Sequence, residues 1–174
     1  MNHAAPVARV ACRSDGSVTV DAEREARVEL IPGPVGWRVV GLDATEGRAE
    51  RVVEDGGGFR LRRASSADDE GARTVRFPDG LTGREAQGRH VLLEDGRLFR
   101  LVERGGTDPR FELLSWEVPG PYLVARPADD GWTIEPEASG GALADLRALW
   151  VLMALEILDA ETNGMMGRTT DDAP

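Results

Sequence analysis

The chain has 174 residues and a hydrophobic content of 41%, which is enough for the core of one domain and excludes wholesale disorder. Its 31 acidic residues outnumber its 21 basic ones, so the net charge is −10. Such a surface repels duplex nucleic acid and anionic lipid, because both are bound through neutralised phosphates. All of the basic residues are Arg, which we ascribe to the codon usage of a GC-rich bacterial genome.

The cysteine content and the apolar runs predict a soluble, cytoplasmic protein. Cys12 is the one cysteine, and it ends the strand-like run from Val7, so we expect a buried structural thiol and no internal disulfide. No charged segment followed by an apolar stretch opens the sequence, so we expect no signal peptide. The longest apolar run, Ala148 to Leu155, has eight residues, whereas a membrane-spanning helix needs about twenty.

Tight turns between short apolar runs dominate the chain up to about residue 136. Asp-Gly pairs are preferred in hairpins because Gly tolerates a positive φ, and five of them occur: Asp15-Gly16, Asp55-Gly56, Asp79-Gly80, Asp95-Gly96 and Asp130-Gly131. Apolar residues at every second position, as in Phe59-Arg60-Leu61-Arg62 and Trp132-Thr133-Ile134-Glu135, indicate strands with one buried face. We count about ten to twelve strand candidates, a spacing typical of sandwiches and barrels.

The region after Ser139-Gly140-Gly141 differs from the rest. Strong helix formers fill Leu143 to Glu161, and we predict a helix from Leu143 to Asp159. Apolar residues lie on every side of this helix, so it must be buried on every side, within the sheet or against a partner. We therefore predict one domain over residues 1–161 and a disordered tail over 162–174.

The last third of the chain resembles the tubby C-terminal-like superfamily, which includes tubby, the phospholipid scramblases and the LURP-one-related proteins. Pro121 to Pro136 (PYLVARPADDGWTIEP) is similar to the last hairpin of such a domain, and Leu146 to Glu161 (LRALWVLMALEILDAE) resembles the scramblase helix. Trp37 stands where these domains often have an early aromatic residue. The resemblance implies a closed antiparallel β-barrel of about twelve strands with the hydrophobic C-terminal helix through its centre.

Two candidate ligand sites accompany this resemblance. Scramblases carry a proposed calcium segment before the helix, where this chain has Asp129 and Asp130; two carboxylates before a glycine are explained by the turn alone, and calcium takes six to eight oxygens. Tubby domains bind phosphoinositide head groups in a basic pocket, and the matching candidates here are Arg60, Arg62, Arg63, Arg73 and Arg76. The alternative for these arginines is an ordinary solvated strand face.

No catalytic set is indicated by the sequence. His3 and His90 are the only histidines, the triple glycine at 56–58 precedes a strand rather than a helix, and no cofactor or metal site is expected. The leading prediction is therefore a non-enzymatic binding or scaffolding module of tubby-like fold, with a lipid head group or a protein as ligand and no nucleic acid. The alternative is a structural subunit of a larger assembly whose helix is partly buried by a partner; an enzyme ranks third.

Overall fold

A computed structural model gives the structure of the chain. It describes residues 7–22, 26–42, 47–52, 57–63, 71–77, 88–137 and 143–167, without the side chains of residues 26, 76, 77, 88, 143–145 and 163–167. The Asp-Gly pairs at 55–56 and 79–80, the predicted tail from residue 168 onwards and His3 lie outside these ranges.

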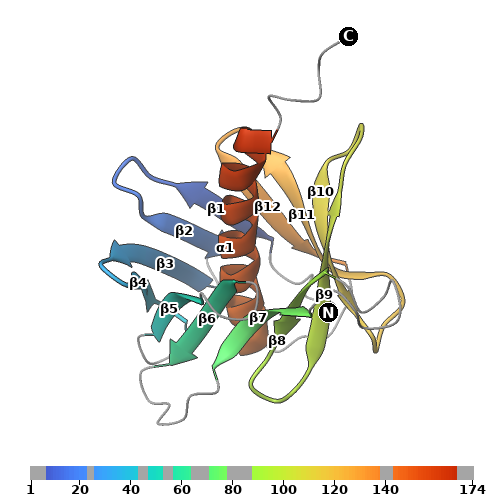
Figure 1. Cartoon of the computed structure of the whole chain (residues 1–174), viewed down its shortest axis with the longest axis horizontal. Helices are drawn as coiled ribbons and strands as arrows, with labels where there is room; N and C mark the ends of the chain where they lie inside the picture. Colours follow the sequence, from blue (N-terminus) through green and yellow to red (C-terminus); the bar gives the residue numbers. More distant parts are fainter. Residues whose placement is uncertain are drawn as a thin grey trace.

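The described residues form a closed antiparallel β-barrel around a single helix (Figure 1). Each strand pairs with its neighbours in the chain, and β1 pairs with β12 to close the ring. The predicted fold is confirmed. The elements are β1 (Ala8–Cys12), β2 (Val18–Ala22), β3 (Ala26–Gly33), β4 (Gly36–Val40), β5 (Gly47–Val52), β6 (Gly58–Arg63), β7 (Ala72–Phe77), β8 (Gly88–Leu92), β9 (Leu98–Arg104), β10 (Arg110–Ser115), β11 (Pro121–Ala128), β12 (Gly131–Pro136) and α1 (Leu143–Gly167).

Two hairpins, β1–β2 and β8–β9, use the same turn chemistry. In the first, the Asp15 carboxylate accepts a hydrogen bond from the Ser17 backbone N–H at 2.9 Å, and Gly16 has a φ of 83°. In the second, Asp95 accepts from the Arg97 backbone N–H at 3.0 Å. Hydrogen bonds from the Ser17 hydroxyl and backbone lower the pKa of Asp15. These are two of the tight hairpins that the Asp-Gly pairs predicted.

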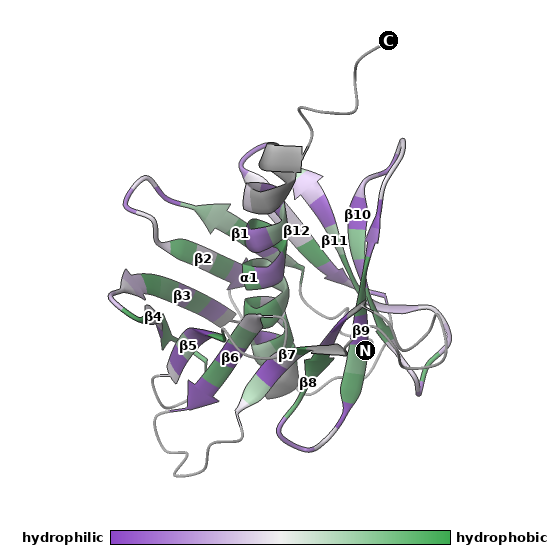
Figure 2. Ribbon diagram, in the orientation of Figure 1, coloured by the Kyte–Doolittle hydropathy of each residue, from purple (hydrophilic) through white to green (hydrophobic). Residues whose placement is uncertain are grey.

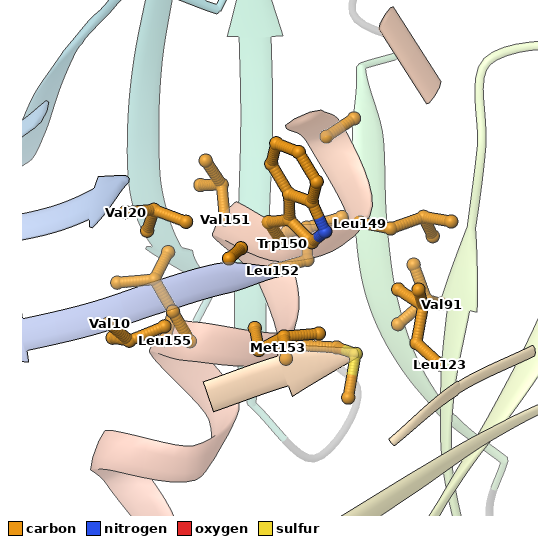
Figure 3. Packing of buried hydrophobic residues seen from close by; sticks show 14 of the residues in the cluster. Val10, Val20, Val91, Leu123, Leu149, Trp150, Val151, Leu152, Met153 and Leu155 are labelled. Atoms are coloured by element: carbon orange, nitrogen blue, oxygen red, sulfur yellow. The ribbon is translucent and has the colours of Figure 1, made fainter. Parts of the chain in front are cut away.

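The core lies between the inner face of the barrel and the helix. Every residue from Ala148 to Ile157 is at most 4% exposed, so this part of the helix is buried on all sides, as predicted. Figure 3 shows helix residues among side chains of the wall: Leu149, Trp150, Leu152 and Leu155 lie among Val10, Val20, Val91 and Leu123. The barrel itself therefore supplies the burial that the apolar helix requires.

Two sequence predictions are corrected at the end of the barrel where the helix leaves it. The helix does not end at Asp159 but continues to Gly167, so residues 162–167 are helical and do not belong to a tail. The indole N–H of Trp132 donates to Glu161 at 2.8 Å, which holds this extension against β12. Cys12 is exposed and not buried, because it is the last residue of β1 and lies at the barrel rim.

In the described part of the chain, no helix combines the length and hydropathy that a membrane crossing requires.

We predict that Leu152→Asp destabilises the protein by about 3–5 kcal/mol and removes most of the soluble yield, because the carboxylate would enter a site without polar partners. Leu152 is fully buried in the middle of α1. The matched control is Leu152→Met, which conserves volume and should cost less than about 1.5 kcal/mol. Thermal unfolding of both variants tests this. A soluble Leu152→Asp protein with an unchanged Tm would show that the helix is not buried as described.

Candidate anion-binding site

Three of the five predicted arginines lie together on the outer face of the barrel. Phe59 and Leu61 of β6 point to the core, so Arg60 and Arg62 between and beside them point outwards. Arg73 of β7 is the cross-strand partner of Arg60. Figure 2 shows the resulting alternation as purple and green bands along β6.

The other two predicted arginines are placed differently. Arg63 is the last residue of β6, where its Nε lies 3.6 Å from the Glu94 carboxylate, and it also lines the groove described below together with Arg62. Arg76 occupies the position opposite Arg89 in the β7–β8 register, and its side chain lies outside the described residues. Arg89 itself faces the helix. Whether Arg76 takes part in the site therefore stays a prediction.

Two further arginines that sequence reasoning missed complete the outer face. Arg38 of β4 pairs with Arg48 of β5, and Arg48 pairs with Arg62 of β6. The three side chains form a row across three strands, beside the second row made by Arg60 and Arg73. We call these five residues the arginine face. No motif could have found this row, because Arg38 and Arg48 join it only through the strand register.

One carboxylate lies among the five arginines within the described strands β4 to β7, and Arg38 and Arg62 have further interaction partners besides. Glu50 is the only acidic residue within strands β4 to β7. Its two oxygens lie 3.7 Å from Arg48 Nη2 and 3.7 Å from Arg62 Nε, respectively. Within these four strands, the arginine face therefore places five guanidinium groups beside one carboxylate, on a chain whose net charge is −10.

A groove of about 570 Å³ runs over the outer face of β4 to β6. Arg38, Arg48 and Arg62 line it together with the β3–β4 hairpin, which contributes Pro34 and Val35. Val35 is 80% exposed at the hairpin tip. The site therefore combines guanidinium groups with an apolar tip. The other large exposed apolar side chain among the described residues, Trp116 at 60%, lies in the β10–β11 connection at the opposite end of the barrel.

Trp37 anchors the groove to the core. Its ring meets the buried Phe59 edge-on, with the ring centroids 5.7 Å apart. The Arg51 guanidinium lies 4.9 Å from the centroid of the same Phe59 ring, and its Nη1 is 2.8 Å from the Asp159 carboxylate of the helix. A continuous series of contacts therefore joins the C-terminal half of α1 to the apolar side of the groove.

The remaining charged clusters have structural roles. Arg89 of β8 bonds to the buried Glu156 of the helix, and its Nη2 lies 3.6 Å from Asp159. On the β9–β10 hairpin, Glu112 accepts hydrogen bonds from Arg104 at 3.0 Å and Arg110 at 2.8 Å. Burial works to raise the pKa of Glu112, but these bonds outweigh it and hold the pKa below its ordinary value.

The remaining nucleophile and base candidates are Cys12 and His90. Although Cys12 is exposed at the rim, desolvation by the atoms around it, and secondarily the nearby Glu161 carboxylate, raise the pKa of its thiol, which disfavours the reactive thiolate. His90 is 1% exposed within β8.

Asp129 and Asp130 form the two-residue loop between β11 and β12. The flanking Ala128 and Gly131 are paired across the hairpin, so the pair does serve as the predicted turn. Gly131 has a φ of 149°, and a β-carbon there would collide with the Val10 carbonyl oxygen of β1, so the position requires glycine. No group of three or more His, Cys, Asp or Glu side chains suited to a metal ion occurs among the described residues.

No family model matches the sequence, and no curated protein or solved structure is significantly similar to the chain.

We predict that Glu156→Gln destabilises the protein by about 2–3 kcal/mol, because it leaves the Arg89 guanidinium beside the helix with only the more distant Asp159 carboxylate. Replacing both partners, as in Arg89→Met with Glu156→Leu, should cost less than the single change, since no buried charge is then left without its partner. Urea unfolding with an unchanged m-value measures both. A double variant less stable than Glu156→Gln would contradict this account of the pair.

We also predict that calcium does not stabilise the protein, because the turn offers two carboxylates where calcium takes six to eight oxygens. A bound ion at a hundredfold excess over its Kd would add about 2.7 kcal/mol, which is several degrees in Tm for a domain of this size. Melting is compared in millimolar calcium and in chelator. A rise in calcium that disappears in the Asp129→Asn, Asp130→Asn variant would establish a site at this turn.

Proposed function

We propose that this protein is a non-enzymatic, cytoplasmic binding module that takes a phosphorylated lipid head group in the groove beside Arg38, Arg48 and Arg62 of its arginine face. The observation that carries the proposal is the row of Arg38, Arg48 and Arg62 along a groove whose rim ends in the exposed Val35.

The chemistry of the row suits phosphate. A guanidinium presents several N–H donors in a rigid planar fork that matches phosphate oxygens. Glu50 approaches Arg48 and Arg62 at 3.7 Å, which orients their side chains. Exposed charges more than about 8 Å apart are largely screened at physiological salt, so the local arginines outweigh the distant acids of the chain.

The apolar tip favours a lipid over a free phosphate. Pro34 and Val35 connect β3 to β4 and project at the edge of the groove. An apolar tip next to guanidinium groups can enter the interfacial region of a bilayer while the arginines contact phosphates at the same depth. The resemblance of Pro121 to Glu161 to the tubby C-terminal-like superfamily implies the same class of ligand, and membership of that superfamily is part of the proposal.

The main reason for the alternative function, a structural subunit of a larger assembly, does not apply to this structure. That alternative rested on a helix that would need a partner to cover its apolar surface. The barrel buries residues 148–157 within the chain, so no partner is required for that purpose. A protein ligand on the arginine face remains the second outcome of the experiment below.

We predict that the full chain binds phosphatidylcholine vesicles carrying a few per cent of a multiply phosphorylated inositol lipid, and binds phosphatidylserine vesicles weakly because of its net charge. Arg48→Gln or Arg62→Gln should reduce affinity about fivefold each, since an arginine near an anionic surface contributes about 1 kcal/mol. Val35→Asp should weaken binding further, because a carboxylate cannot enter the interface. Vesicle co-sedimentation at several salt concentrations measures these changes.

Two control variants lie away from the groove. Arg126→Gln removes a similarly exposed arginine from β11, on the opposite wall, and Trp116→Ser removes the exposed apolar residue at the opposite end. Both should bind as the unchanged protein does. Equal loss in the controls, or no binding to phosphorylated vesicles, would overturn the proposal. Binding of an acidic protein segment or of duplex DNA that depends on Arg48 and Arg62, without vesicle binding, would reassign the face to that ligand.

A further inference from the structure

Arg60 and Arg73 form a like-charge pair across strands β6 and β7. They are directly opposite in the register, and both point outwards. Residues opposite one another in an antiparallel pair have β-carbons about 5 Å apart, and like charges in that position destabilise a sheet. An arginine pair of this kind calls for a counter-charge.

The described residues do not supply that counter-charge. Neither Arg60 nor Arg73 forms an ion pair with any described residue, and their strands contain no acid. Glu50 is the cross-strand neighbour of Arg60 on β5, but its oxygens lie against Arg48 and Arg62. The Arg60 Nε is buried and has no hydrogen-bond partner.

We infer that Arg60 and Arg73 bind a compact oxyanion of the phosphate class, separate from the groove lined by Arg38, Arg48 and Arg62. A tetrahedral phosphate has enough oxygens to accept from both guanidinium forks at once. Its charge of about −1.5 to −2 near neutral pH offsets both cations. Chloride offers no directional acceptors. The anion can be inorganic phosphate or the phosphate of a monoester, free or on a lipid, and the inference does not depend on a membrane.

The position of the pair gives the anion a place beside the groove. Arg60 and Arg62 are two residues apart on the same face of β6, so the pair adjoins the row of groove arginines. The lining of the groove includes Arg62 but neither Arg60 nor Arg73. The two sites can therefore be separated by mutation.

The test uses inorganic phosphate and the full chain. Tm is measured over a phosphate titration against sodium chloride of equal ionic strength, and the Kd is obtained by calorimetry. We expect phosphate to raise Tm above the chloride series. Arg73→Gln and Arg60→Gln should each weaken phosphate binding about tenfold. The phosphate affinity of Arg73→Lys should lie between those of the unchanged protein and Arg73→Gln, because lysine keeps the positive charge but lacks the planar fork of donors. In phosphate-free buffer, both Gln variants should be no less stable than the unchanged protein, since each removes a like-charge contact.

Two comparisons make the outcome decisive. Arg126→Gln removes an equal charge from β11 on the opposite wall, outside both proposed sites, and should leave phosphate affinity within about twofold of the unchanged protein. Equal shifts in phosphate and chloride, or equal losses in Arg126→Gln and Arg73→Gln, would mean that only general charge screening is present and would overturn the inference. The vesicle experiment is an independent test. If the protein binds phosphate but not vesicles, only the lipid proposal is overturned. If it binds vesicles but not phosphate, only the phosphate site at Arg60 and Arg73 is overturned.

Discussion

The requirement to bury an apolar helix on every side determines the architecture of this protein. A helix with one apolar stripe can lie on a sheet, but the segment around Trp150 and Leu152 has no side that water can contact without loss. A closed antiparallel barrel surrounds such a helix without leaving a sheet edge unpaired. The connection between successive strands then alternates between the two ends of the barrel, and the helix passes from one end to the other (Figure 1).

This arrangement restricts where a binding site can form. The inner face of the wall is occupied by contacts with the helix, and polar groups there serve to hold the helix in place, as Arg89 does with Glu156. What remains for a ligand is the outer face and the two rims. Alternation along each strand makes the outer positions independent of the core, so the outer residues can change without loss of packing. A cluster of like-charged residues on that face is therefore more informative than one inside the barrel, because the core does not require it.

The sequence predicted the architecture better than the site, for identifiable reasons. The helix and most strands were found because apolar periodicity reports burial directly. Strand β5 gave a weaker signal, since its inward residues are Gly47 and Ala49, which are small. Arg48 was missed for that reason, and Arg38 was missed because only the register places it beside Arg48. Arg63 was assigned to the face, but it lies at the end of β6 and contacts Glu94. Whether an outward residue lies in the middle of the face or at the barrel rim depends on its position along the strand. The alternation of apolar and polar residues does not show that position.

A rigid wall also affects how strongly the arginine face can bind. Fixing one arginine side chain costs up to about 2 kcal/mol of conformational entropy, which would offset much of the gain from a charged hydrogen bond. The barrel fixes the backbone of all five arginines, Glu50 orients Arg48 and Arg62, and burial of Nε confines the stem of Arg60. Part of the ordering is therefore present before a ligand arrives. The repulsion among neighbouring guanidinium groups is likewise present in the unbound protein, and an anion that relieves it gains that energy in addition to its own contacts. Local order and local repulsion would together favour the anion binding that we propose for this face of an acidic chain.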